Sequence, residues 1–279
     1  MLARNSHVAL DGFVPIRRPL GNGIDDDIEF LQSQSAAVAL ISHGSDLRHP
    51  DLHRDHFKHS YFDHADEAWN DAMRRLVERN QRTVTGHSNL RLFVSTPDQL
   101  VLYPHAVWLP LCVDSGLFSV DVQPVLSGRV PVVLHIPSRR TPPIKGTHFI
   151  DPIMQSLASR GIIQYVSPEA VSHGEMMRLM ANADIVIDQL LVGAYGVTAV
   201  EAMALGRSVI CAVSDEVRRA LPEDPPLVTA TPKTLEAAVH ELIGEPDHYS
   251  ALAARGREYA RAWHDGRASA AALAPFVAE

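Results

Sequence analysis

Short, predominantly apolar runs alternate with amphipathic stretches along most of this chain. The runs predict buried parallel strands and cover residues 36–41, 90–95, 132–136, 161–166, 184–188, 208–212 and 227–230. The stretches between them have the periodicity of helices, and alanine-rich helices are expected at about 231–243, 246–263 and 266–277. This alternation predicts the α/β class, with doubly wound parallel sheets.

The same pattern predicts two domains. Residues 119–130 have the character of a linker, and a new sheet begins with the apolar run 132–136. We therefore divide the chain into a reduced N-terminal domain, residues 1–119, and a C-terminal domain, residues 120–279.

The most informative stretch runs from Gly193 to Ile210, between two predicted strands. It predicts a glycine turn followed by a short buried helix that ends at Gly206. Gly196 lies where the turn becomes the helix, so free backbone N–H groups there would face an anion. Glu201 lies one turn into this apolar helix, where a carboxylate suits a vicinal diol; a helix-dipole or solvated surface glutamate is an equal alternative.

The pattern Gly-x-x-Gly-x-x-Ala-x-Glu-Ala-Met-Ala-x-Gly in this stretch resembles the donor-binding signature of retaining glycosyltransferases of the GT-B fold, family GT4. The resemblance implies two Rossmann-type domains that face a cleft, with Glu201 on the ribose of a nucleotide sugar. It places Gly196 and Val197 at the diphosphate, and Gly193, Tyr195 and Asp188 near the sugar. The family has a second glutamate where this chain has Gly193, and Asp188 or Gln189 could take over its contacts.

A basic loop follows the strand 132–136. Arg139, Arg140 and Lys145 surround a strand-to-helix turn, and Thr147 is expected to cap the next helix. Such a loop is often merely solvated, but it also has the chemistry of a diphosphate clamp. Family members have an arginine five residues before a Lys-Gly pair, a spacing that Arg140 and Lys145 share, with Arg139 as a substitute. The resemblance further implies that Val166 and Ser167 border the base.

In the N-terminal domain, His43-Gly-Ser-Asp46 follows a predicted strand directly. On the local pattern alone it is a turn with a helix cap. It resembles the family loop whose histidine approaches the transferred sugar, which implies a catalytic role for His43. The resemblance extends over about residues 36–279, and His264-Asp265-Gly266-Arg267 is similar to the family's tail, which packs across both domains. The N-terminal sheet is short for this family, so a protein partner or a second copy could pair with it.

Composition limits the partners and the compartment. A formal net charge of −8 argues against nonspecific nucleic-acid binding. Cys112 and Cys211 lie in apolar runs and predict buried thiols in a reducing compartment. With no apolar run of transmembrane length, we expect a cytoplasmic protein or one at the membrane periphery. Six histidines lie between His43 and His64, but Pro50 interrupts them and no cysteine joins them, so we expect no metal site.

These features predict a glycosyltransferase that moves a sugar from a nucleotide-diphosphate-sugar co-substrate to an unidentified acceptor, which could be a small molecule, a glycan or a lipid-linked group. The catalytic candidates are His43 and Glu201. Retention of configuration is implied by the resemblance, and no cofactor or metal is expected. The alternative from another class is a non-catalytic nucleotide-sugar-binding partner of an active transferase. A third is an epimerase or hydrolase on the same fold.

Overall fold

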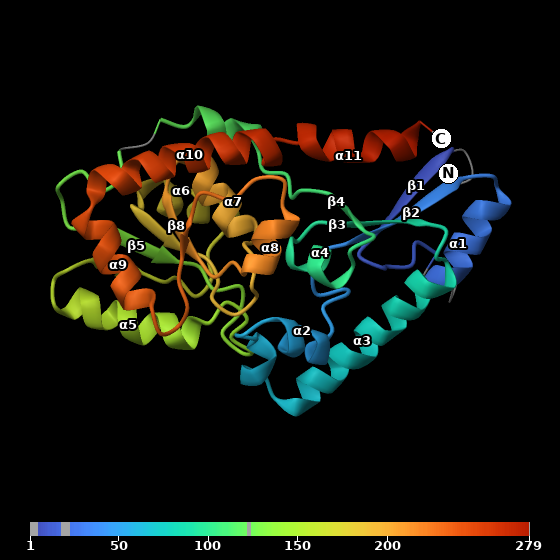
Figure 1. The fold of residues 1–279 in the computed structure, drawn as a ribbon, viewed down its shortest axis with the longest axis horizontal. Helices are drawn as coiled ribbons and strands as arrows, with labels where there is room; N and C mark the ends of the chain where they lie inside the picture. Colours follow the sequence, from blue (N-terminus) through green and yellow to red (C-terminus); the bar gives the residue numbers. More distant parts are fainter. Residues whose placement is uncertain (1–4, 18–22, 122–123, 279) are drawn as a thin grey trace.

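The computed structural model describes residues 5–17, 23–121 and 124–278. Its N-terminal part is a parallel sheet in the order β1-β2-β3-β4 (Figure 1). The strands are β1 (His7–Asp11), β2 (Ala37–Ser42), β3 (Arg91–Val94) and β4 (Val107–Trp108). The strand β1 was expected only as a short apolar piece, and it pairs with β2 over its whole length.

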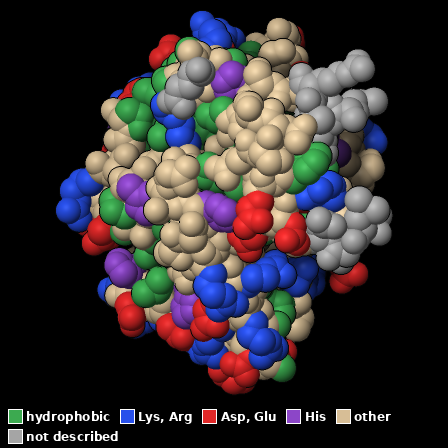
Figure 2. All heavy atoms as spheres, turned by 90° about the vertical axis from the view of Figure 1, so that its right-hand side faces the viewer, with side chains coloured by type: hydrophobic (Ala, Val, Ile, Leu, Met, Phe, Trp, Pro, Cys, Tyr) green, Lys and Arg blue, Asp and Glu red, His purple; other side chains and the backbone are tan. Residues whose placement is uncertain are grey.

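Helices of very different length connect or follow these strands, and side-chain caps begin several of them. They are α1 (Ile24–Ser33), α2 (Pro50–His56), η3 (Tyr61–His64), α3 (Glu67–Gly86), α4 (Asp98–Leu102) and η4 (Ser115–Ser119). The carboxylate of Asp26 accepts the Gly23 N–H at 2.7 Å at the start of α1, and Asp66 accepts the Trp69 N–H at 2.7 Å at the start of α3. Figure 2 shows this end of the molecule, where basic and acidic side chains are mixed and hydrophobic ones are scattered.

The C-terminal part is a second parallel sheet in the order β6-β5-β7-β8-β9. Its strands are β5 (Val132–His135), β6 (Gln164–Val166), β7 (Ile185–Ile187), β8 (Ser208–Cys211) and β9 (Val228–Thr229). Its helices are α5 (Thr147–Ser159), α6 (His173–Asn182), α7 (Val197–Ala204), α8 (Asp215–Ala220), α9 (Leu235–Gly244), α10 (Pro246–His264) and α11 (Arg267–Val277). Every residue of β7 and β8 is buried, because separate apolar clusters cover the two faces of the sheet.

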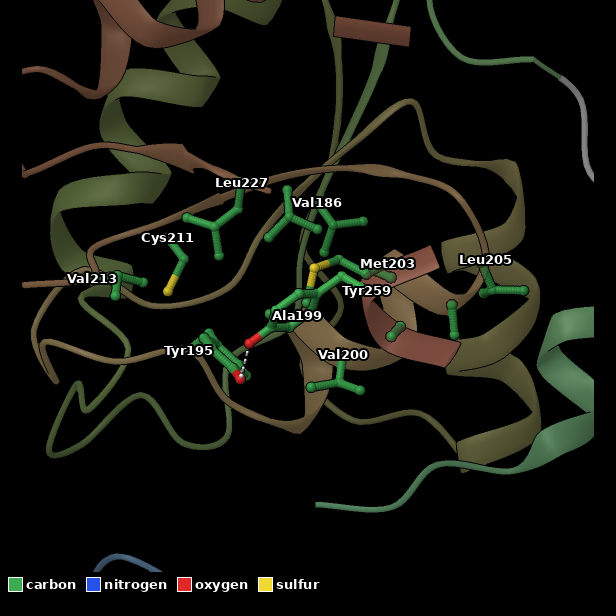
Figure 3. Close-up of a cluster of buried hydrophobic side chains, with 14 of the residues drawn as sticks. Val186, Tyr195, Ala199, Val200, Met203, Leu205, Cys211, Val213, Leu227 and Tyr259 are labelled. Carbon is green, nitrogen blue, oxygen red and sulfur yellow. Dashed lines mark hydrogen bonds between the residues drawn. The ribbon is translucent and has the colours of Figure 1, made fainter. Parts of the chain in front are cut away.

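The C-terminal tail joins the two parts. The helix α10 packs on α7, and its Tyr259 hydroxyl hydrogen-bonds the hydroxyl of Tyr195, in the loop before α7, at 3.0 Å (Figure 3). The next helix, α11, extends over the N-terminal sheet, and its Phe276 packs on Ala39 and Phe93 (Figure 1). The expected crossing of the tail over both domains is therefore confirmed. The division at residue 119 falls between the two sheets and stays a prediction.

Two local expectations were wrong. Thr147 is the first residue of α5 and not its cap; the cap position belongs to Gly146, which has a φ of +84°. The Thr147 hydroxyl instead bonds the buried ring of His135, with 2.8 Å between Oγ1 and Nε2. Cys211 is buried as expected, but Cys112 is exposed because its strand-to-linker segment runs along the surface. Among the described residues, no helix is both long enough and apolar enough to cross a membrane.

Candidate functional site

The order of the C-terminal strands places a topological switch point between β5 and β7. The chain leaves β5 toward β6 on one side and returns to β7 on the other, so the two loops that follow β5 and β7 diverge at this point. Ligands of open α/β sheets bind at such a switch point, outside the carboxyl ends of the strands. The predicted basic loop follows β5, and the predicted glycine turn follows β7.

Lys145 and Asp188 form a buried ion pair at this switch point. The Lys145 Nζ lies 2.9 Å from Asp188 Oδ1 and donates to Thr198 Oγ1 at 2.8 Å. The other oxygen of Asp188 accepts the Gly196 N–H at 2.7 Å. The prediction of a free Gly196 N–H is therefore wrong, because the Asp188 carboxylate accepts the hydrogen bond that was expected to go to a bound anion. Val197, at the first position of α7, is 47% exposed, so the helix end opens to solvent there.

Glu201 lies deeper, one turn into α7, and is 6% exposed. Its Oε1 lies 3.0 Å from Nε2 of His173, the first residue of α6. Its Oε2 is buried and has no hydrogen-bond partner among the described residues. A buried carboxylate oxygen without a partner is costly, so this atom marks a place for a donor group of a ligand. The contact of His173 with Glu201 was not predicted, because nothing in the local sequence around His173 shows that the start of α6 faces α7.

The two predicted arginines take different positions. Arg140 donates to Asp151 Oδ2 at 2.5 Å and to Ser167 Oγ at 3.2 Å. Asp151 also accepts the Tyr165 hydroxyl at 2.6 Å; burial raises its pKa, but the bonds from Tyr165 and Arg140 leave that pKa below its ordinary value. The structure thus joins Arg140 to the predicted base-contact residue Ser167, and no contact between described residues joins it to Lys145. Arg139 is exposed, and Val166 is half-buried.

On the N-terminal side, three side chains meet at the ends of three neighbouring strands. The His43 ring follows β2, and its Nδ1 lies 3.0 Å from Ser95 Oγ, which follows β3. Its Nε2 contacts the Asp11 carboxylate at the end of β1, and the His43 N–H donates to Asp46 Oδ2 at 2.7 Å. The His43 side chain is 47% exposed, so a ligand can reach it. Asp11 and Ser95 were not predicted, although each comes at or just after the end of a strand.

The loop 189–195 is covered by the segment that follows β2. The His53 Nε2 lies 3.1 Å from the Val192 carbonyl oxygen, and the Tyr61 N–H donates to the Leu191 carbonyl at 3.1 Å. The Phe57 ring packs on Gly193. The side chain of Tyr195 is 1% exposed and points into the core, so it cannot provide the predicted sugar contact; only its backbone borders the loop (Figure 3).

Of the histidines in the segment 43–64, His53 packs in the core, whereas His43, His56 and His64 are exposed. His53 is buried, and burial together with nearby Arg48 lowers its pKa to about 4. Within residues 5–17, 23–121 and 124–278, no group of three or more histidine, cysteine, aspartate or glutamate side chains could hold a metal ion.

The comparisons with known proteins bear on the fold. No family model and no curated protein sequence matches this chain. Among solved structures, sucrose-phosphate synthase from Thermosynechococcus elongatus is similar, with a TM-score of 0.61 and 15% identity over 98% of this chain and 73% of that one. The chain has the GT-B fold.

Two further GT-B structures are similar at the same low identity. HepE from Anabaena, in complex with UDP-glucose, has a TM-score of 0.58 and 14% identity over 98% of this chain and 79% of that one. WaaG, a glycosyltransferase involved in lipopolysaccharide biosynthesis, has a TM-score of 0.53 and 14% identity over 89% of this chain and 80% of that one. The two parallel-sheet domains predicted for this fold are thereby confirmed.

Proposed function

We propose that this chain binds a nucleotide-diphosphate sugar and transfers the sugar to an acceptor. The observation that carries the proposal is the Glu201 carboxylate, which is buried beside the switch point with one oxygen unpartnered. A ribose hydroxyl is a donor of suitable size and polarity for that oxygen. Solved structures of the same fold include one in complex with UDP-glucose, which supports this choice of ligand.

In this proposal the diphosphate lies between Lys145 and the exposed first turn of α7. Positive charge and backbone N–H groups would stabilise the negative charge that develops on the diphosphate as the glycosidic bond breaks. Asp188 neutralises part of the Lys145 charge, so the diphosphate would compete with Asp188 for Lys145 and for the Gly196 N–H. Arg139 is exposed and could turn toward the diphosphate. In this proposal the basic residues neutralise the diphosphate, so no metal is required.

The N-terminal residues 1–119 would bind the acceptor, and residues 120–279 the donor. His43, with its ring held by Asp11 and Ser95, would face the sugar from the acceptor side. Membership of family GT4 and retention of configuration are part of this proposal and rest on the sequence resemblance. The cytoplasmic location stays a prediction.

A non-catalytic nucleotide-sugar-binding partner is the second candidate. It is favoured by Gly193, which stands where the resemblance expects a glutamate and which lies under Phe57. Such a protein would keep the contacts at Glu201 but would not complete the transfer.

A thermal-shift titration with UDP, GDP, ADP, TDP and their common sugars tests the binding step. A ligand that binds only the folded chain at about 100 times its Kd stabilises it by about 2.7 kcal/mol, so one nucleotide should raise the Tm by several degrees. The shift should fall in Glu201→Gln and persist in the control Glu29→Gln, an exposed glutamate of α1. No shift with any of the nucleotides means the proposal is wrong.

Release of free nucleotide from the bound nucleotide sugar then separates the two candidates. If the chain is a transferase, the wild-type protein should release nucleotide slowly when water accepts the sugar and faster when a suitable acceptor is present. His43→Ala should lose most of that turnover while its nucleotide-induced shift stays. If the wild-type chain binds the nucleotide sugar but releases no nucleotide with any acceptor screened, the non-catalytic binding partner is favoured.

A further inference from the structure

The side chain of Tyr195 ends in a buried hydrogen-bond network away from the surface. Tyr195 lies in the donor turn, which we define as residues 193–196, and its hydroxyl meets α10 in the core (Figure 3). That hydroxyl lies 3.0 Å from the Tyr259 hydroxyl and 3.2 Å from Nε2 of His264, the last residue of α10. All three side chains are at most 2% exposed, so these bonds are shielded from bulk solvent.

The tautomer of His264 gives this network a direction. The His264 Nδ1 lies 2.7 Å from the Leu111 carbonyl oxygen, which can only accept, so Nδ1 carries a proton. Burial lowers the pKa of His264 to about 4, so the ring is neutral near pH 7 and its Nε2 is an acceptor. Tyr195 therefore donates to Nε2 and accepts from Tyr259. The hydrogen bonds run from Tyr259 through Tyr195 and His264 to the backbone of Leu111.

His264 lies where the two sheets are connected. The crossover, residues 109–114, follows β4 and leads toward the C-terminal sheet. His264 holds it at two positions, because its ring bonds Leu111 and its carbonyl oxygen accepts the Val113 N–H at 3.0 Å. The His264 ring also packs edge-on against Trp108 of β4, with 6.0 Å between the centroids. One histidine therefore joins the donor turn to the last strand of the N-terminal sheet.

Other bonds hold the donor turn in place on its own sheet. Gln189 Nε2 donates to the Ala194 carbonyl oxygen at 2.5 Å, and the Ser214 N–H donates to the Gly193 carbonyl oxygen at 2.9 Å. These bonds do not involve the Tyr195 hydroxyl, so the turn should keep its shape when that hydroxyl is removed. What the hydroxyl adds is the link from the donor turn to the crossover.

We propose that Tyr195, Tyr259 and His264 are positioning residues of the transfer reaction. Resting on the proposed function, they align the donor turn with the acceptor side of the molecule, whereas Glu201 and Lys145 provide the affinity for the nucleotide. Transfer requires the reacting atoms to meet in a defined geometry, and a misplacement of about 1 Å can lower the rate about 100-fold. Removing the Tyr195 hydroxyl should therefore lower turnover more than it lowers donor affinity.

Tyr195→Phe tests the proposal, because it removes the hydroxyl and keeps the buried ring. The substrate is the nucleotide sugar that gives the largest thermal shift, with the best acceptor screened or with water. The kcat of nucleotide release should fall about tenfold, whereas KM and the Kd of the nucleoside diphosphate should stay within about twofold of wild type. The matched control is Tyr249→Phe, which removes a hydroxyl of α10 that donates to Glu241 at 2.5 Å and should leave kcat unchanged.

Two variants of His264 add a conservative rescue. A glutamine amide can accept from Tyr195 and donate to Leu111, whereas a leucine side chain can do neither. His264→Gln should therefore retain a kcat several times that of His264→Leu. Hydrogen exchange gives a readout that does not depend on turnover. The Val113 N–H should exchange about fivefold faster in Tyr195→Phe than in wild type or Tyr249→Phe, because its acceptor His264 is held less firmly.

Equal kcat in wild type and Tyr195→Phe overturns the proposal. A parallel loss of turnover and of nucleotide affinity also overturns it, since that pattern indicates damage to the donor site itself. Unchanged exchange at Val113 in Tyr195→Phe does the same, because the crossover would then not depend on Tyr195. Failure of the proposed function appears in the wild-type chain instead, as the absence of a nucleotide-induced shift or of any nucleotide release, and it would remove both proposals.

Discussion

The Phe57 ring lies directly against the α-carbon of Gly193. A Cβ atom added at Gly193 would lie 2.4 Å from Phe57 Cδ1 and 2.8 Å from Cε1, well inside van der Waals contact. Gly193 also has a φ of +78°, in the region that favours glycine. Position 193 therefore requires glycine for two independent reasons, and the glutamate expected from the resemblance has no space there while Phe57 holds its place.

Gly193→Ala should destabilise the chain by about 2–4 kcal/mol, since overpacking against Phe57 adds to the cost of the backbone conformation. Gly161→Ala is the matched control, because Gly161 has a φ of +72° but nothing within 4 Å of an added Cβ. It should cost about 1 kcal/mol, as measured by urea unfolding. Equal costs at the two positions would contradict the steric role of Phe57.

The same relationship predicts coupling between the two residues. In the Phe57→Ala background, Gly193→Ala should lower the free energy of unfolding by about 1–3 kcal/mol less than it does in wild type, because the ring that blocks the new methyl group is gone. A double-mutant cycle in urea measures this energy. Strict additivity would show that the ring can move aside freely.

Glu201 and His173 should control the affinity for the nucleotide. Glu201→Gln is expected to weaken nucleoside diphosphate binding about 10- to 100-fold, because a hydrogen bond to a charged acceptor is worth about 1.5–3 kcal/mol. The loss should be much smaller for a 2′,3′-dideoxynucleoside diphosphate, which lacks the hydroxyls. His173→Ala should give a partial loss, since it frees Oε1 and the carboxylate can turn. An equal loss for both nucleotides would place the ribose elsewhere.

The sequence predicted elements and loops well, because each depends on local periodicity and on glycine positions. The runs that became β2, β5, β7 and β8 are predominantly apolar, and the alanine-rich tail helices were placed within a few residues. The partners of the site side chains could not be predicted in the same way. Asp188 faces Lys145 across 43 positions of sequence, and Phe57 reaches Gly193 from the other domain.

Some partners of the site side chains could be suspected from their positions in the sequence. Asp11 ends β1 and Ser95 follows β3, so both come at the edge of the sheet that carries His43. Recognising them required the parallel pairing of β1 with β2, and residues 7–10 are too short and too near a glycine- and proline-rich segment to predict it. The resemblance suggested Asp188 as a sugar contact. It gave no indication that the Asp188 carboxylate accepts the Gly196 N–H.

Lys145 should matter for stability as well as for binding. Lys145→Ala leaves the fully buried Asp188 carboxylate without its cation, and breaking a buried pair costs about 3–5 kcal/mol. Lys145→Ala/Asp188→Asn should recover much of that loss, because the amide carries no charge. The control Arg160→Ala breaks an exposed pair with Glu236 and should cost less than about 1 kcal/mol. Urea unfolding measures all three, and a small loss in Lys145→Ala would mean that water reaches Asp188.

Buried histidines should make the chain sensitive to mild acid. Burial lowers the pKa of His53, His135 and His264 to about 4 in the folded chain, against an ordinary value of 6.5. Between pH 6.5 and 4 the unfolded chain therefore binds protons that the folded chain does not, so stability falls as the pH falls through this range and levels off below it. At pH 5 each of these histidines should remove about 2 kcal/mol of stability relative to pH 7.

His135→Gln isolates one of these contributions. The His135 ring hydrogen-bonds the Ile187 carbonyl oxygen and the Thr147 hydroxyl, and a neutral amide can replace part of this pattern without taking up a proton. The variant should be less stable than wild type at pH 7, but its loss of stability between pH 7 and pH 5 should be about 2 kcal/mol smaller. The exposed control His248→Gln should leave the pH dependence as in wild type. If His135→Gln also leaves it unchanged, water or a rearranged loop reaches the ring in the folded state, and the packing of α5 on β5 is looser than these contacts require.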